Sequence, residues 1–174
     1  CGMKQLLKNL KKIFTITFLL VSLMVFSQSE TTYPKITGYV SVMHPIVTIN
    51  KDHTTTNFDG YYQVVFPVGI NIWKSSRIGF SIELAPGIRA ENGTSKVNNL
   101  LIHPGVLVAL GDGFVFAGRV AFETSGRYGI TPVFSKVVKK NKNSALYIAT
   151  PLPIRFGNDL PTSFTAGFQI GLSF

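Results

Sequence analysis

The sequence predicts an all-β protein: an antiparallel transmembrane β-barrel of eight strands after an N-terminal signal peptide. Three observations lead to this prediction. Apolar and polar residues alternate over long stretches, an apolar leader stands near the N-terminal end, and residues 163–174 are apolar at every even position. Alternation with a period of two gives a strand two unlike faces. After the leader, no stretch shows a helical period.

The closing stretch, residues 163–174, shows this alternation most clearly. Its odd positions are small or polar, and its even positions are Phe164, Ala166, Phe168, Ile170, Leu172 and Phe174. In a transmembrane barrel the bulky side chains face lipid and the small polar ones face the lumen. In a soluble sheet the bulky side chains would face a shared core. A soluble periplasmic β-barrel that binds an apolar ligand therefore stays open as an alternative.

Residues 1–27 have the layout of a secretory signal peptide. Lysines fill the first part, the apolar run 13–26 follows, and cleavage is expected after Ser27. A short polar lead, 28–34, then precedes the barrel, 35–174. The apolar run is shorter than the roughly 20 residues of a spanning helix, and an uncleaved anchor helix is the alternative. Cys1 and Gly2 precede Met3 and are interpreted as an artefact of cloning or annotation.

Charge and cysteine content exclude several functional classes. The formal net charge is +9, and four of the lysines lie in the leader. The rest of the sequence shows no basic patch interleaved with aromatic residues, so we expect no nucleic-acid partner. Beyond the leader there is no cysteine. A disulfide, a thiolate metal site and a thiol nucleophile are therefore excluded from that part of the chain.

Eight amphipathic strands are predicted, with a bulge near His44 and Pro45, where the apolar parity slips. The ranges are 35–49, 61–73, 77–89, 99–110, 114–124, 130–138, 144–156 and 163–174. Their lengths match or exceed the roughly 9 to 11 residues of a tilted spanning strand. The connections alternate between short turns and outer loops, and the outer loops are 50–60, 90–98, 125–129 and 157–162. We expect Asn92-Gly93-Thr94 to form a turn in the second loop.

Prolines lie inside most of the predicted strands. Proline lacks the N–H donor of a ladder and normally avoids central strands. These prolines predict either bulges that curve a small barrel or strands that kinks divide into shorter pieces. They are Pro45, Pro67, Pro86, Pro104, Pro132, Pro151 and Pro153.

Four charged residues fall on the predicted inner face: Glu83, Arg119, Glu123 and Arg155. An eight-stranded barrel is only wide enough for side chains to fill it. Buried charges in such a space have to pair. We therefore predict an internal network of ion pairs in the lumen, and the alternative is a polar path for small solutes.

The three histidines, His44, His53 and His103, are far apart and follow no metal-ligand spacing. Lipid-cleaving barrels use a histidine with a serine, yet no G-x-S-x-G signature is present. We expect no catalytic residue, no metal and no cofactor, and we expect that the protein is not an enzyme.

Aromatic residues near the strand ends predict the interfacial belts of a membrane barrel. The residues concerned are Tyr33, Tyr39, Tyr61, Tyr62, Trp73, Tyr128 and Phe174.

A signal peptide followed by amphipathic strands and a last strand that ends in Phe174 resembles the small outer-membrane β-barrel proteins of Gram-negative bacteria. The similar members are the transmembrane domain of outer-membrane protein A and outer-membrane protein X, and the resemblance covers about 35–174. It implies residence in the cell outer membrane, contact with lipid and lipopolysaccharide, and recognition of the Phe174 strand by the barrel-insertion machinery. It also implies a monomer.

The resemblance further implies a structural or surface-interaction role through the outer loops, as in members of this cell-envelope group with packed interiors. A porin-like narrow channel or carrier for small or apolar solutes is the alternative. The filling of the lumen distinguishes the two. Water along the face of Glu83 and Arg119 would favour transport, whereas a dry and paired face would favour the first role.

Overall fold

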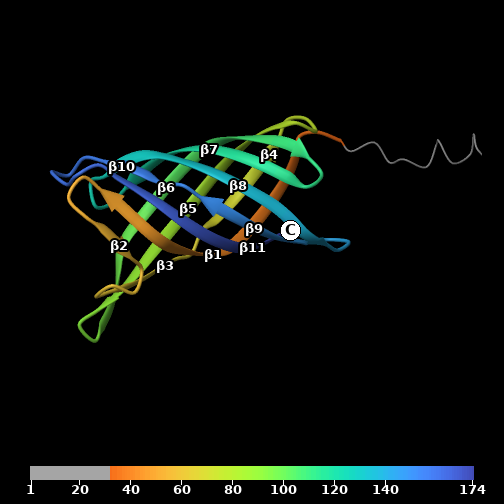
Figure 1. Ribbon diagram of the computed structural model, residues 1–174. Coiled ribbons are helices and arrows are strands. Elements are labelled where there is room, and N and C mark those ends of the chain that lie inside the picture. The colour runs from red at the N-terminus through yellow and green to blue at the C-terminus, as the bar shows by residue number, and fades with distance from the viewer. Residues whose placement is uncertain (1–31) are drawn as a thin grey trace, which may run out of the picture. The chain divides into compact units, whose positions relative to one another are not determined.

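The structure, a computed structural model, describes residues 32–174. The predicted signal peptide and most of the polar lead lie outside these residues. The described chain forms one antiparallel sheet of eleven strands (Figure 1). Between Thr32 and Phe174 no helix is long and apolar enough to cross a membrane. The strands are β1 (Lys35–Asn50), β2 (Thr54–Thr56), β3 (Tyr62–Val65), β4 (Val68–Trp73), β5 (Ile78–Glu91), β6 (Thr94–Gly111), β7 (Phe114–Glu123), β8 (Tyr128–Lys140), β9 (Ala145–Pro151), β10 (Ile154–Phe156) and β11 (Ser163–Ser173).

The sheet closes on itself because β1 pairs with β11 along most of its length. Beyond the end of β11, Phe174 and Gly38 exchange two backbone hydrogen bonds of 2.8 and 2.9 Å. The ring has eight strand positions, which we call staves. Two staves are divided, one into β3 and β4 and the other into β9 and β10. The short strand β2 lies in the connection after β1 and adds no further stave. The predicted eight-stranded antiparallel barrel is therefore confirmed.

The prolines produce both of the predicted irregularities. Pro67 divides the second stave and Pro153 divides the seventh, while β1 has a register shift between Pro45 and Val47. Other prolines lie within continuous strands. The sheet stays connected because proline carbonyls still accept from the neighbouring strand, as Pro86 does from the Phe66 N–H at 3.0 Å. Each proline thus lacks one ladder donor, while the carbonyls of Pro67, Pro86, Pro132 and Pro153 still accept hydrogen bonds.

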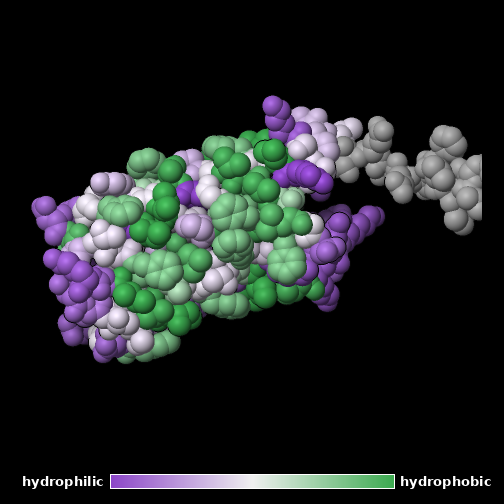
Figure 2. All heavy atoms as spheres, turned by 45° about the horizontal axis from the view of Figure 1, so that its top comes forward, coloured by the Kyte–Doolittle hydropathy of each residue, from purple (hydrophilic) through white to green (hydrophobic). Residues whose placement is uncertain are grey.

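The bulky side chains point away from the lumen. In β5 the outward row runs from Ile78 to Ile88, about the length of strand needed to cross a bilayer. Two of its members, Phe80 and Ile82, are 41% and 49% exposed. Figure 2 shows apolar residues across the middle of the barrel and hydrophilic residues gathered at both ends. A soluble barrel with an apolar interior would need the opposite facing, so that alternative is wrong.

Small residues on the inner face let the wall approach the side chains that fill the lumen. A Cβ at Gly105 would lie 2.5 Å from the Gly118 carbonyl oxygen and 2.6 Å from Cγ of Arg119. Two apolar clusters also occupy the interior. One joins Leu107, Ala117, Val133 and Ala149, and the other joins Met43, Val65 and Ala85.

The two ends of the barrel differ in their connections. One end has the connections 74–77, 112–113 and 141–144, and we call it the turn end. The other end has the connections 51–61, 92–93, 124–127 and 157–162, and we call it the loop end. The predicted outer loop 90–98 is wrong, because β5 and β6 continue as a hairpin that projects at the loop end (Figure 1). Asn92 and Gly93 form its turn, with φ of 51° and 73°. Residues 91–98 are all exposed, so neither face carries an apolar row that sequence could reveal.

The predicted aromatic belts need a correction at two residues. Tyr39 is 3% exposed and Trp73 lines a cavity inside the barrel, so neither contacts lipid. Both occupy inward positions, and facing is decided by parity along the strand rather than by nearness to its end. Tyr33, Tyr128 and Phe174 are exposed near strand ends, as a belt requires.

Candidate functional site

The first part of the lumen network surrounds Glu83 on β5. Its Oε2 accepts a hydrogen bond from the Tyr39 hydroxyl at 2.7 Å and lies 3.7 Å from Nη2 of Arg119 on β7. The same Nη2 donates to the Tyr39 hydroxyl at 3.2 Å and to Oγ of Ser81 at 3.3 Å. Strands far apart in sequence therefore meet at a single carboxylate.

The second part of the network joins Glu123 on β7 to Arg155 on β10. Nε of Arg155 donates to Oε1 of Glu123, and Nη1 donates to Oγ1 of Thr131 at 3.0 Å. The other carboxylate oxygen of Glu123 accepts from the Asn99 amide at 2.6 Å and from the Ser125 hydroxyl at 3.0 Å. This carboxylate is therefore fixed by three donors.

His103 on β6 connects the two parts. Its Nδ1 lies 2.9 Å from Oε1 of Glu83, and its Nε2 lies 3.1 Å from Nη2 of Arg155. Arginine has donors only, so Nε2 accepts and Nδ1 carries the proton that is donated to Glu83. This tautomer makes one continuous chain of hydrogen bonds from Tyr39 to Glu123.

The network is buried and balanced in charge. Glu83, His103, Arg119 and Arg155 are 4%, 5%, 8% and 6% exposed. Two carboxylates face two guanidinium groups, so the formal charges of these groups cancel. In such a buried environment each hydrogen bond is stronger than in water, and each unpaired group is costly. We call this arrangement the polar plug.

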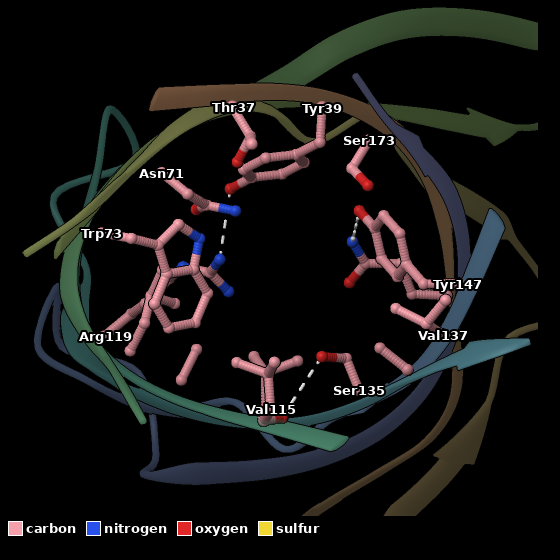
Figure 3. A pocket seen from close by; sticks show the side chains of 15 residues that line it. Thr37, Tyr39, Asn71, Trp73, Val115, Arg119, Ser135, Val137, Tyr147 and Ser173 are labelled. Carbon is pink, nitrogen blue, oxygen red and sulfur yellow. Dashed lines mark hydrogen bonds between the residues drawn. The ribbon is translucent and has the colours of Figure 1, made fainter. Parts of the chain in front are cut away.

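A chamber of about 220 Å³ lies on the turn side of this plug (Figure 3). Tyr39, Trp73, Arg119 and Tyr147 point into it, together with smaller apolar and polar side chains. Nε of Arg119 and Oδ1 of Asn71 are buried here without a protein hydrogen-bond partner. Buried polar groups without a protein partner suit ordered water. Within residues 32–174 no group of three or more His, Cys, Asp or Glu side chains is placed to hold a metal ion.

The structure brings together the residues predicted from sequence as two pairs, Glu83 with Arg119 and Glu123 with Arg155. Sequence reasoning missed the two residues that hold the network together, Tyr39 and His103. The alternation of inward and outward positions along each strand could have indicated His103. It lies opposite Glu83 in the register of β5 and β6 and therefore shares the inward face. His44 and His53 lie elsewhere, and His44 contacts the hydroxyl of Tyr62 at 2.6 Å.

A closed sheet, an outward apolar face and a lumen that holds paired charged side chains define the fold of a transmembrane β-barrel. The chain is similar to a solved structure titled "De novo design of transmembrane beta-barrels", with a TM-score of 0.50 and 13% identity, over 84% of this chain and 98% of that chain. A solution NMR structure of the de novo designed TMB2.3 aligns with a TM-score of 0.39 and 12% identity, over 84% and 97%. No family model and no curated protein matches the sequence. The chain is therefore a membrane β-barrel protein by fold.

Proposed function

We propose that this protein is an outer-membrane β-barrel with a structural or surface-interaction role, and that its lumen does not conduct. The observation that carries the proposal is the polar plug. Its charged side chains are paired and no more than a tenth exposed. A solute on this path would have to separate buried ion pairs, which strands uncompensated charge in a dry interior. The channel or carrier is therefore the less favoured candidate.

The loop end supplies the surface for such interactions. Phe58 is 80% exposed and stacks on Tyr62 with ring centroids 5.5 Å apart. A groove separates residues 58–62 from the tip of the projecting hairpin, 90–95. The guanidinium of Arg89 lies 3.9 Å from the ring centroid of Tyr61 and fixes one side of this groove. An exposed aromatic beside a groove favours contact with a partner.

Placement in the outer membrane follows from the resemblance to the outer-membrane protein A and outer-membrane protein X barrels, together with the predicted signal peptide. On this proposal the turn end is periplasmic, the loop end contacts lipopolysaccharide, and the barrel is a monomer. The insertion machinery would recognise the strand that ends in Phe174. This proposal is supported by the position of that strand, which is the one that closes the ring against β1.

Fractionation of cell envelopes tests the location. Cells that make the full chain are separated into inner- and outer-membrane fractions, and each fraction is run heated and unheated on a gel. We expect the protein in the outer-membrane fraction with a mobility that shifts on heating. Recovery in the inner-membrane or soluble fraction would contradict the proposed location.

Conductance in planar bilayers tests the closed lumen. We expect no steady current from the wild-type chain. A variant with the plug removed, Tyr39→Ala with Arg119→Ala and Arg155→Ala, is expected to pass ions and shows that the assay detects an open barrel. Heat-dependent mobility verifies that both proteins are inserted. A steady wild-type current would support the channel instead.

We also propose that the protein is not an enzyme. Both ring nitrogens of His103 are engaged within the network, and its side chain is buried. A His103→Gln variant is therefore expected to leave the lipid composition of the envelope unchanged. A difference in lipid acylation between wild type and this variant would revive the catalytic alternative.

A further inference from the structure

The charged side chains of residues 32–174 are distributed very unevenly. This region has 13 basic and 7 acidic side chains, a net charge of +6. The buried network has a net charge of zero. The loop end also balances, because Lys51, Arg89, Lys96 and Arg127 are matched by Asp52, Asp59, Glu91 and Asp159. The whole excess of +6 therefore lies at the turn end.

The turn end has seven basic side chains and one acidic side chain, Asp112, within the described residues. We call these basic residues the cationic rim: Lys35, Lys74, Arg77, Lys136, Lys139, Lys140 and Lys142. They lie at two places on the ring, at the start of β1 beside the connection 74–77 and along the hairpin of β8 and β9, so the charge is not confined to one loop. All of them are exposed except Lys136, which is half-buried.

The cationic rim borders the apolar belt directly. Lys136 follows Phe134 in the outward row of β8, and its Nζ lies 3.8 Å from the ring centroid of Phe114. Arg77 precedes Ile78, which is 54% exposed, and Lys139 follows Val138, which is 50% exposed. Long basic side chains at such positions lay their stems on apolar surface and extend their charges to the headgroup level.

We propose that the cationic rim binds the phosphates of anionic phospholipids in the leaflet at the turn end, and so anchors and orients the barrel. This deepens the proposed lipid contact and rests on the membrane-barrel fold. Basic side chains near an anionic bilayer surface each add attraction that salt weakens. The loop end has no net side-chain charge and offers no such attraction. The two ends of the barrel therefore differ in their attraction to anionic lipid.

A lipid headgroup fits the rim better than a soluble acidic protein. The charges form two groups that each adjoin the apolar belt. Lys35, Lys74 and Arg77 lie beside the first turn of the ring, and Lys136, Lys139, Lys140 and Lys142 lie on the hairpin of β8 and β9. A layer of phosphates can contact both groups at once. A docked domain would need one contiguous area, and the turn between β6 and β7 carries only the acidic Asp112.

Native mass spectrometry of lipid adducts tests the proposal. The full chain is reconstituted in nanodiscs of equal parts phosphatidylglycerol and phosphatidylcholine, released gently, and its retained lipids are counted. Two variants lose the same charge at opposite ends: Lys139→Gln with Lys140→Gln at the turn end, and Lys51→Gln with Lys96→Gln at the loop end. All four lysines are exposed. The heat-dependent mobility shift verifies insertion separately from lipid preference.

We expect wild type to retain phosphatidylglycerol preferentially. The turn-end variant should lower the retained ratio of phosphatidylglycerol to phosphatidylcholine by about threefold or more, while the loop-end variant leaves it unchanged. An equal ratio in all three proteins would overturn the proposal and favour a soluble acidic partner. An equal fall in both variants would also overturn it, because only total charge would then matter. If the turn-end variant fails to insert, the same lipid ratio is measured for wild type in high salt. We expect salt to lower the preference for phosphatidylglycerol, and an unchanged ratio would overturn the proposal.

Discussion

Nε2 of His103 lies 3.1 Å from Nη2 of Arg155, where an arginine donor has to meet an acceptor. The imidazole therefore donates from Nδ1 to Glu83 at 2.9 Å. One neutral ring thus connects two ion pairs that come from different strands. The plug is a single network because of this residue, and without it the Glu83 and Glu123 groups would be separate.

Replacing His103 should destabilise the barrel. His103→Ala leaves one oxygen of Glu83 and one donor of Arg155 unpaired in a dry interior, and we expect a loss of about 1 to 3 kcal/mol in the free energy of unfolding. Urea titration in phosphatidylcholine vesicles, followed by heat-dependent mobility, measures this loss. His53→Ala is the matched control, since His53 is exposed in a loop and its loss should cost less than about 0.5 kcal/mol. Equal stabilities would contradict the bridging role.

Two of the three Arg–Glu pairs within residues 32–174 should differ in strength according to burial. The side chains of Arg119 and Glu83 are 8% and 5% exposed, whereas those of Arg89 and Glu91 are 32% and 46% exposed. Arg119→Met strands a buried carboxylate and should cost about 3 to 5 kcal/mol. Arg89→Met should cost at most about 1 kcal/mol. The same urea titration compares the two, and adding Glu83→Gln to Arg119→Met should recover part of the loss.

Gly105 should tolerate no side chain, because a Cβ there would meet the Gly118 carbonyl oxygen at 2.5 Å and Arg119 at 2.6 Å. Gly105→Val is expected to displace Arg119 and lower the yield of folded barrel. Gly118→Val on the neighbouring strand is the control. The nearest atom to a Cβ at Gly118 belongs to Phe116, at 3.5 Å, an ordinary contact. If Gly105→Val gave the wild-type amount of folded barrel, the two strands would be able to move apart, and the prediction would be wrong.

Thiol labelling should locate the boundary between the chamber and the plug. In a Cys1→Ser background, Ser135→Cys faces the chamber and should react with a small water-soluble thiol reagent. Ser81→Cys, at a position that is 0% exposed, should remain unreactive until the protein is denatured. Mass spectrometry of the labelled chains measures both. Rapid labelling at position 81 would reveal water in the plug and favour a conducting lumen.

Sequence reasoning predicted the barrel well because one rule operates along the whole wall. Each strand has lipid on one side and a narrow lumen on the other, so alternation records the facing of residues such as Phe168 and Gln169 directly. The rule fails at the projecting hairpin, where Glu91 and Lys96 have water on both faces and leave no apolar row. It also placed Tyr39 and Trp73 with the interfacial aromatics, because nearness to a strand end was weighed before parity.

The sequence by itself determined the number of staves, their amphipathic facing and the four charges that enter the lumen. These follow from local alternation, which each strand carries alone. The partners of those charges were decided by tertiary structure. Whether Glu83 meets Arg119, and whether His103 reaches both Glu83 and Arg155, depends on strand register and on how closely a closed wall brings distant strands together. The concentration of positive charge at the turn end likewise emerges only after the ring assigns every connection to one end.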